Sequence, residues 1–338
     1  MATKNKSWLW ASAGIGLIVA LRAFAREQNK YSFQNKVVVI TGGSRGLGLV
    51  LARQLAAEGA LLAICSRTED QLKKAEQELT AKGAEVLALP CDVTNRIQAE
   101  QFIERVLKYY GRIDVLINNA GTIQAGPLAD MTLTDFEEAM NTHFWAPLYT
   151  MWATVPHMKE RSQGRIVNIA SVGGKVSIPH LVPYSASKFA LVGLSNGFRQ
   201  ELKKDGILVT TVNPGLTRTG SNLNIKVKGQ SEKEYAWFTT AGASLLISSS
   251  VEKTARKIIN ACRYGEAEVL TNVPAKILAF ANQILPELTS DALSLTNKIL
   301  PEESGNEINS WGYENESDLI PEHLRDRAAR AARENNEL

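Results

Sequence analysis

The stretch Thr41-Gly42-Gly43-Ser44-Arg45-Gly46-Leu47-Gly48 decides the fold of this chain. It follows the apolar run Val37–Thr41, which predicts a buried strand, and it opens an expected helix over Leu47–Glu58. Glycines allow a tight turn and let the backbone approach a pyrophosphate, whose charge then lies at a helix N-terminus. Many glycine turns are only tight connections, but a strand before and a helix after favour a dinucleotide-binding turn.

Working outward from this turn, apolar runs alternate with helical patterns from Lys36 to about Leu270. Most runs are continuously apolar, as expected for parallel strands buried on both faces. The alternation predicts an α/β fold with a Rossmann-like, doubly wound parallel sheet. The expected strands are Val37–Thr41, Leu61–Cys65, Val86–Leu89, Val115–Asn118, Ile166–Ile169, Ile207–Val212 and Glu268–Leu270. The expected helices are Leu47–Glu58, Glu69–Lys82, Arg96–Tyr110, Thr134–Arg161, Tyr184–Lys204 and Val251–Cys262.

The end of the second expected strand reads Cys65-Ser66-Arg67. A carboxylate about 20 positions past the glycines would bind the ribose 2′-hydroxyl of NAD. Ser66 stands in that place, with Arg67 beside it and Arg45 inside the glycine loop. Two guanidinium groups suit a 2′-phosphate, which arginine binds through paired hydrogen bonds, so we expect NADPH as the cofactor. The alternative interpretation is two solvated surface arginines.

Three side chains further along the chain suggest acid/base chemistry. Tyr184 and Lys188 are spaced i and i+4 on an expected helix and share one face, and Ser171 follows a buried strand. A tyrosine has an ordinary pKa of about 10, and a nearby ammonium favours its phenolate. Tyr-x-x-x-Lys is a common accident on its own. Its position after a strand-end serine and a dinucleotide turn makes it informative.

In their order and spacing these motifs resemble the signature of the short-chain dehydrogenase/reductase family. The resemblance rests on Thr41–Gly48, Asn118-Asn119-Ala120-Gly121, Ser171, Tyr184-Ser185-Ala186-Ser187-Lys188 and Asn213-Pro214-Gly215, and it covers roughly residues 34 to 270. It is specific to the superfamily and carries no information on the substrate.

The resemblance implies a role for each matching residue. Ser171, Tyr184 and Lys188 are expected to be catalytic. Tyr184 and Lys188 are also expected to contact the cofactor, with Lys188 holding the nicotinamide ribose. The other expected cofactor contacts are Thr41, Gly42, Ser44, Arg45, Gly46, Leu47, Gly48, Arg67, Asp92, Val93, Asn119, Ala120, Gly121, Pro214, Gly215 and Thr219. No metal site is expected, because the four histidines and three cysteines form no ligand pattern.

One position departs from the family pattern. The usual active-site asparagine, on the long helix after Asn-Asn-Ala-Gly, is replaced by His143 if the count starts from Phe136, whereas Asn141 lies two residues earlier. Residues two apart on a helix point in different directions, so only one of them can fill the slot. His143 is favoured for the slot and is expected to be a fourth catalytic residue, whose imidazole supports a water chain to Lys188. An imidazole there would be expected to titrate near neutrality, where an amide would not.

The expected reaction is reduction of a small-molecule carbonyl, with Tyr184 as the general acid/base. Substrate choice is expected in 216–250, the least regular part of the body. Its apolar residues Tyr235, Trp237, Phe238, Leu245, Leu246 and Ile247 suggest a lipophilic ketone or a 3-oxoacyl-like substrate, although lid packing would explain them as well. A non-catalytic dinucleotide-binding scaffold or sensor, and an isomerase or dehydratase on the same fold, are the alternatives.

Residues 1–32 are expected to form a hydrophobic anchor segment. The run Trp8–Leu21 lies between Lys4 and Lys6 on one side and Arg22, Arg26 and Lys30 on the other. As a helix it would span only about 21 Å, against a hydrocarbon core of about 30 Å, so flanking residues must contribute. A cleaved signal peptide and a soluble extra helix are the alternatives. The heavier positive flank on the C-terminal side favours membrane association through residues 1–30 with a cytoplasmic enzyme body.

The catalytic domain is expected over 33–270 and an extension over 271–338. The extension begins with apolar-striped segments at Ala275–Leu285 and Leu288–Leu300, which would pack on the body, touch a membrane or cover the cleft. A polar, mostly extended tail with one short helix at Glu322–Glu334 is expected to follow. The resemblance implies a homodimer or homotetramer, because family members usually pair through the long helices that here correspond to Thr134–Arg161 and Tyr184–Lys204, and the apolar content of these helices fits such an interface. The net charge of +3 gives no reason to expect a nucleic-acid partner.

Overall fold

The computed structural model describes residue 24 and residues 26–315 and 317–338. Most of the expected anchor segment lies outside the described residues. Within the described part, no helix is both long enough and apolar enough to cross a membrane.

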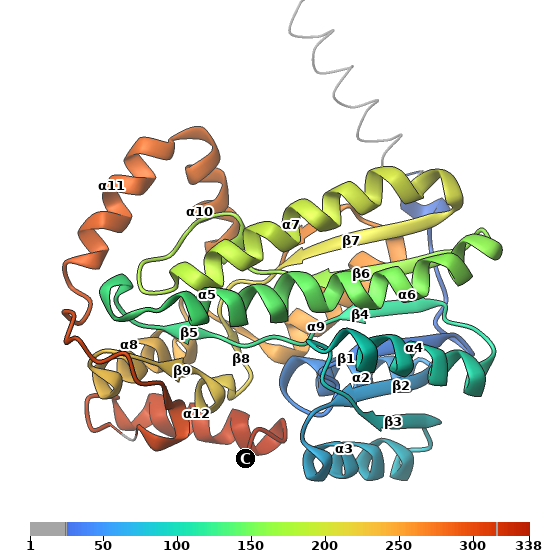
Figure 1. Ribbon diagram of the computed structural model, residues 1–338, viewed down its shortest axis with the longest axis horizontal. Coiled ribbons are helices and arrows are strands. Elements are labelled where there is room, and N and C mark those ends of the chain that lie inside the picture. Colours follow the sequence, from blue (N-terminus) through green and yellow to red (C-terminus); the bar gives the residue numbers. More distant parts are fainter. Residues whose placement is uncertain (1–23, 25, 316) are drawn as a thin grey trace, which may run out of the picture.

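A seven-stranded parallel sheet forms the centre of the molecule (Figure 1). Its strands follow the order β11-β7-β6-β4-β1-β2-β3. From β1 the chain adds β2 and β3 on one side and then returns to add β4, β6, β7 and β11 on the other, which confirms the doubly wound α/β fold. The strands are β1 (Val37–Thr41), β2 (Leu61–Ser66), β3 (Val86–Pro90), β4 (Val115–Asn118), β6 (Gly164–Ile169), β7 (Ile207–Asn213) and β11 (Glu268–Leu270). Each lies within two residues of its expected range.

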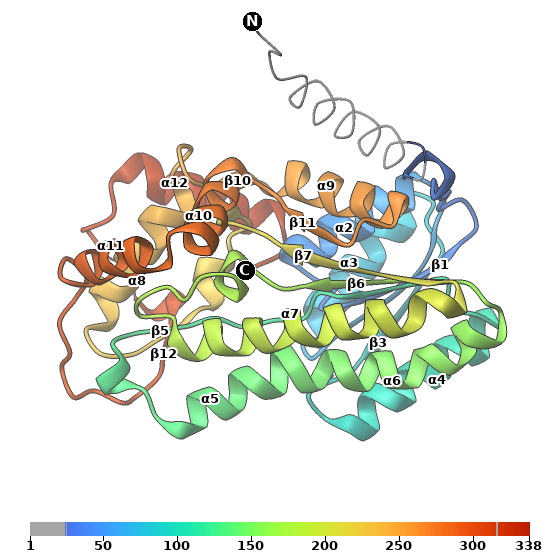
Figure 2. The same ribbon diagram turned by 90° about the horizontal axis from the view of Figure 1, so that it is seen from above.

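Helices cover both faces of this sheet (Figure 2). Alternate residues of β1 enter opposite cores: Val38 and Ile40 pack with the first, and Val37 and Val39 with the second. This explains why the strand reads as a continuous apolar run. The first core includes α2 (Gly46–Ala57), α3 (Glu69–Ala81) and α9 (Val251–Tyr264). The second includes α4 (Arg96–Tyr110), α6 (Ala146–Glu160) and the end of α7 (Val182–Leu202).

The single long helix expected over Thr134–Arg161 is wrong. The structure has α5 (Leu133–Met140), a π-helical turn at Asn141–Trp145 and then α6. In the turn the Ala146 N–H bonds the carbonyl of Asn141, five residues back. Pro147 follows and has no N–H to continue the ordinary pattern, which accounts for the wider turn.

Helix α8 (Ser231–Ala243) lies in the region expected to be least regular. Around it are two small sheets. One pairs β8 (Thr217–Arg218) with β10 (Ser249–Ser250), and the other joins β5 (Gln124–Ala125), β9 (Lys226–Val227) and β12 (Ser310–Trp311). Strand β12 therefore attaches the C-terminal part of the chain to the body.

The segment after the sheet forms α10 (Val273–Ile284) and α11 (Pro286–Asn297), both within two or three residues of the expected ranges. Helix α12 (Glu322–Glu334) has the expected bounds, and the stretches 302–309 and 335–338 contain no helix or strand. Ile320 and Leu324 are buried in one cluster with Phe238 of α8, and Ala328 packs against that cluster. This burial fixes α12 on the body, with its C-terminal end running toward α2 and α3 (Figure 1).

Candidate functional site

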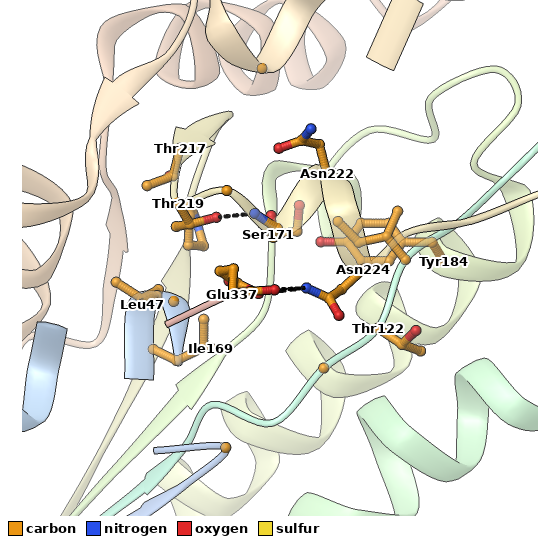
Figure 3. A pocket seen from close by; sticks show the side chains of 18 of the residues that line it. Leu47, Thr122, Ile169, Ser171, Tyr184, Thr217, Thr219, Asn222, Asn224 and Glu337 are labelled. Atoms are coloured by element: carbon orange, nitrogen blue, oxygen red, sulfur yellow. Dashed lines mark hydrogen bonds between the residues drawn. The ribbon is translucent and has the colours of Figure 1, made fainter. Parts of the chain in front are cut away.

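A cleft of about 1240 Å³ opens at the carboxyl ends of the central strands. Loops that follow β1, β2, β4, β6 and β7 line one wall, as expected for the ligand side of a doubly wound sheet. Residues of α8, α10, α12 and the C-terminus line the other. Figure 3 shows Ser171, Tyr184 and Glu337 among the residues that line the cleft. Most of the predicted site residues border this one cleft.

The glycine turn forms the floor at one end. Gly42 and Gly46 have φ of +65° and +54°, a backbone region that side chains disfavour. A Cβ on Gly48 would lie 2.0 Å from the carbonyl oxygen of Gly42, so only glycine lets α2 pack this closely on the turn. Gly42, Ser44, Arg45, Gly46 and Leu47 line the cleft.

Thr41 and Gly48 do not line the cleft, although both were expected to contact the cofactor. The Thr41 hydroxyl accepts hydrogen bonds from the backbone N–H groups of Asn119 (3.0 Å) and Ala120 (3.1 Å). The Asn119 amide in turn donates to the carbonyls of Thr41 and Gly42, both at 3.1 Å. These two residues therefore shape the turn, and Asn119, Ala120 and Gly121 also border the cleft.

Polar groups surround the far end of the glycine turn. Ser66, Arg67, Asp92 and Val93 all line the cleft, and the Arg67 side chain is exposed there. Asp92 is oriented by hydrogen bonds that it accepts from the backbone and hydroxyl of Thr94, at 3.0 and 2.8 Å. Arg45 lies 3.3 Å from the carboxylate of Glu337, a partner that sequence reasoning did not anticipate.

Ser171, Tyr184 and Lys188 meet in the middle of the cleft. Ser171 follows β6, and Tyr184 and Lys188 lie one turn apart on α7. Lys188 is buried, and its ammonium donates to the carbonyl of Ile169 at 3.0 Å. Its Nζ lies 5.6 Å from the centre of the Tyr184 ring.

Burial governs the ionisation of both groups. It raises the pKa of Tyr184, and a hydrogen bond with the Ser171 side chain opposes that rise. It lowers the pKa of Lys188 to about 7. A phenol with a raised pKa stays protonated at neutral pH and can donate its proton, while Lys188 changes charge close to neutrality.

His143 lies in the π-helical turn with its ring 5.3 Å from that of Tyr184, whereas Asn141 is an exposed residue at the cleft edge. Nε2 accepts from the backbone N–H of Thr122 at 3.2 Å, so Nδ1 carries the proton and donates to the Ser187 hydroxyl at 2.8 Å. Burial, together with nearby Lys188, holds the pKa of His143 well below its ordinary value. The expectation that His143 titrates near neutrality is therefore wrong.

The segment after β7 closes the cleft beside these groups. Pro214, Gly215 and Thr219, which are expected to contact the cofactor, line it. A Cβ on Gly215 would lie 2.4 Å from the side-chain oxygen of Asn272, so glycine lets this loop pack against the start of α10.

The other end of the cleft is more apolar. Of the residues expected there, Trp237, Phe238 and Ile247 line it. Tyr235 is buried, and its hydroxyl accepts from Asn222 at 2.9 Å. Leu245 and Leu246 are exposed and lie outside the cleft.

Several cleft residues come from the C-terminal extension and were not predicted individually. They are Asn272 just before α10, Pro274, Ala275 and Leu278 on α10, Trp311 and Tyr313 near β12, Arg327, Ala328 and Ala331 on α12, and Glu337. The apolar stripe of α10 was a usable signal for Leu278. The polar composition of 302–338 offered none for the cleft residues in that range.

Comparison with known proteins agrees with this geometry. The sequence profile of the family described as short chain dehydrogenase matches residues 36–228, more than half of the chain. The zebrafish (Danio rerio) protein named dehydrogenase/reductase SDR family member 7B is 36% identical over 220 residues, which are 63% of this chain and 71% of that protein. The ketoacyl reductase HetN of Nostoc sp. is 34% identical over 254 residues, which are 74% of this chain and 85% of HetN.

Solved structures show the same likeness. L-sorbose reductase of Gluconobacter frateurii, crystallised with NADPH and L-sorbose, superposes with a TM-score of 0.64 and 26% sequence identity. The superposition covers 72% of this chain and 98% of the reductase. The chain therefore belongs to the short-chain dehydrogenase family of oxidoreductases, whose fold binds a nicotinamide dinucleotide.

Proposed function

We propose that this protein reduces a lipophilic ketone or 3-oxoacyl-like carbonyl with NADPH. The observation that carries the proposal is that Ser171, Tyr184 and Lys188 converge in the same cleft as the glycine turn. A dinucleotide lying along that turn would extend toward these three groups. The ketoacyl reductase among the relatives supports carbonyl reduction as the reaction class.

The cleft residues fit a nicotinamide dinucleotide. The Gly46 N–H at the start of α2 would donate to the pyrophosphate, and Asp92 would lie beside the adenine. Arg45 and Arg67 supply positive charge without a competing carboxylate from β2, which favours the 2′-phosphate of NADPH. When bound, NADPH supplies the hydride.

The protein's own residues would handle the proton and the carbonyl oxygen. Tyr184 donates its phenolic proton to the oxygen as negative charge develops, and the Ser171 hydroxyl hydrogen-bonds the same oxygen. Burial keeps Tyr184 protonated until that moment. His143 holds Thr122 and Ser187 in place around Tyr184 and exchanges no proton at neutral pH.

The apolar end of the cleft sets the substrate class. Trp237 donates through its indole N–H to Glu234 at 2.6 Å, so its orientation is fixed. Phe238, Ile247 and Leu278 add apolar surface nearby. Burial of an alkyl chain against such surface is worth about 0.8 kcal/mol per methylene, which favours lipophilic over small polar ketones.

A panel of carbonyl compounds tests this function. NADPH consumption would be followed with lipophilic ketones, 3-oxoacyl thioesters and short polar ketones. We expect turnover to rise with chain length at fixed carbonyl chemistry. Absence of turnover with every member, by a protein that binds NADPH, would instead support the scaffold or sensor.

Self-association forms a second part of the proposal. Trp145, Trp152 and Phe189 are 41%, 67% and 44% exposed on the helices expected to form an oligomer interface. Burying them in a homodimer or homotetramer would remove large apolar surface from water. Sedimentation at micromolar concentration should give an oligomer for the chain lacking residues 1–30, and the variant Trp152→Glu should shift it toward monomer.

Membrane association through residues 1–30 is proposed from the sequence alone. The full chain should partition with membranes, and removal of residues 1–30 should release active enzyme. Full-length protein that is soluble without detergent would contradict the anchor.

A further inference from the structure

The last four residues of the chain, Asn335–Leu338, form a tail that lies on the glycine turn. The Asn335 carbonyl accepts from the Gly46 N–H at 2.8 Å. The Asn336 amide donates to the carbonyls of Ser44 (2.9 Å) and Gln71 (3.0 Å), which joins the turn to α3.

The Glu337 carboxylate lies between Arg45 (3.3 Å) and the Asn224 amide (2.8 Å). Figure 3 shows Glu337 inside the cleft, opposite Leu47.

The tail is held in place from behind as well. Arg53 of α2 donates to the side chain of Asn335 (3.3 Å) and to the carbonyl of Glu334 (3.0 Å). Arg53 is fixed in turn by two 2.7 Å bonds to Glu78 of α3. Asn335 and Glu337 are 1% and 6% exposed, so these two residues are as buried as those of the core.

The groups that bind the tail are those that the fold offers to a dinucleotide. The Gly46 N–H at the N-terminus of α2 is a donor for the pyrophosphate, and it is used by Asn335. A Cβ on Gly46 would lie 2.4 Å from the Glu337 carboxylate, so no room remains between that carboxylate and the turn. Glu337 thus puts a carboxyl group next to Arg45, where the cofactor would bring a phosphate.

We propose that the tail Asn335–Leu338 is a built-in competitor of the dinucleotide, which must leave the glycine turn before the cofactor can bind there. This inference rests on the dinucleotide site of the proposed function. It adds that the affinity of the full chain for its cofactor is reduced by the fraction of molecules in which the tail is docked.

Truncation tests the competition. The chain ending at Glu334 should bind NADPH at least about tenfold more tightly than the full chain, a difference of about 1.4 kcal/mol, as measured by energy transfer from tryptophan to the bound nicotinamide. The double variant Asn336→Ala/Glu337→Ala should show the same direction of change at full length. Leu338→Ser is the matched control, because that side chain is exposed and makes no described hydrogen bond.

The possible outcomes distinguish failure of the tail competition from failure of the proposed function. Equal or weaker binding by both the truncated chain and the double variant, with thermal midpoints like that of the full chain, overturns the competition and leaves the dinucleotide site intact. Failure of all these chains to bind NADPH or NADH contradicts the proposed function itself, and the inference falls with it.

Proton binding gives an independent signature. Burial raises the pKa of Glu337 to about 7. Arg45 and the Asn224 amide both oppose this rise, and Arg45 is the one charged group described in contact with Glu337. A group whose pKa is raised in the docked state makes docking stronger as pH falls. The ratio of NADH dissociation constants, full chain over truncated chain, should therefore rise about tenfold between about pH 8 and about pH 6.

Lys188 also titrates near neutrality, but it is present in both chains, so its effect cancels in the ratio. Glu337→Gln should remove the rise because an amide does not titrate. A ratio that stays constant with pH for the unmodified tail overturns the role given to the carboxylate.

Discussion

The glycine turn and the C-terminal tail occupy the same corner of the cleft but reach it in different ways. The turn is built from neighbours in sequence, and its glycines are required by positive φ at Gly42 and Gly46 and by the close approach at Gly48. The tail comes from 292 positions further along the chain, and side-chain amides and one carboxylate hold it to backbone groups of the turn. Constraints between neighbouring residues produce a recognisable sequence motif, whereas contacts between residues far apart in the sequence do not.

The same contrast holds between the two ends of the cleft. The cofactor end is fixed by motifs on the sheet, and the substrate end is assembled from α8, α10 and β12, which meet only in the folded chain. If this division is correct, variants at each end should change different measurable quantities.

The largest effect is expected where the two ends meet. Tyr184→Phe removes the transferable proton but keeps the ring, so turnover should fall by roughly 10²–10⁴-fold. NADPH affinity should stay within a few-fold of the unmodified enzyme. Tyr109→Phe, at an exposed tyrosine on α4, is the matched control and should leave turnover unchanged. Full activity of Tyr184→Phe would refute the proposed acid.

At the cofactor end, Arg67→Asp should change which dinucleotide binds. We expect the unmodified enzyme to bind NADPH at least about tenfold more tightly than NADH, a difference of about 1.4 kcal/mol. The substitution should erase most of that preference, because it replaces a partner of the 2′-phosphate with a repelling charge. Arg105→Asp, exposed on α4, controls for the change in net charge. Equal binding of both cofactors by the unmodified protein would refute the assignment.

At the substrate end, Leu278→Ala should lower kcat/KM for a long-chain ketone roughly three- to tenfold, since part of an apolar contact is lost. Binding of NADPH should not change. Ile277→Ala is the control, because Ile277 precedes Leu278 on α10 and lies on its outer side, away from the cleft. Equal effects of the two substitutions would show that α10 does not contact the substrate.

The smallest effect is expected at His143. Because its pKa lies well below neutrality, His143→Asn should leave the pH profile of kcat unchanged and activity within about tenfold. His143→Ala should cost stability, since it leaves the Thr122 N–H without a buried partner, at about 1–3 kcal/mol, and removes a donor to the Ser187 hydroxyl, which keeps its bond to the Tyr184 carbonyl. A pH profile of kcat that is displaced in His143→Asn would show that His143 titrates in the working range of the enzyme.

Sequence reasoning predicted the central sheet well, because continuous apolar runs such as Val37–Thr41 have few alternatives to a doubly buried strand. It also brought together Ser171, Tyr184 and Lys188, whose spacing is set by one strand end and one helical turn. It missed the π-helical turn at Asn141–Trp145, which differs from an ordinary helix only in its hydrogen-bond pattern.

The C-terminal segment was harder for a different reason. Its helix Glu322–Glu334 was predicted correctly from a good helix-forming composition. Its docking depends on a few small contacts, such as Leu324 and Ala332, and on the polar partners of Asn335, Asn336 and Glu337. In one sequence these residues are indistinguishable from a solvated tail, so the position of the tail is known only from the structure.

Hydride transfer tests the central claim most directly. The protein would be incubated with a lipophilic ketone and NADPH in which both hydrogens of the hydride-donating carbon are replaced by deuterium, and the alcohol product analysed by mass spectrometry and NMR. We predict one deuterium on the carbinol carbon for each NADPH oxidised, with the rate reduced in Tyr184→Phe. Consumption of ketone without deuterium in the product, or binding of NADPH with no alcohol formed from any carbonyl tested, would contradict the account.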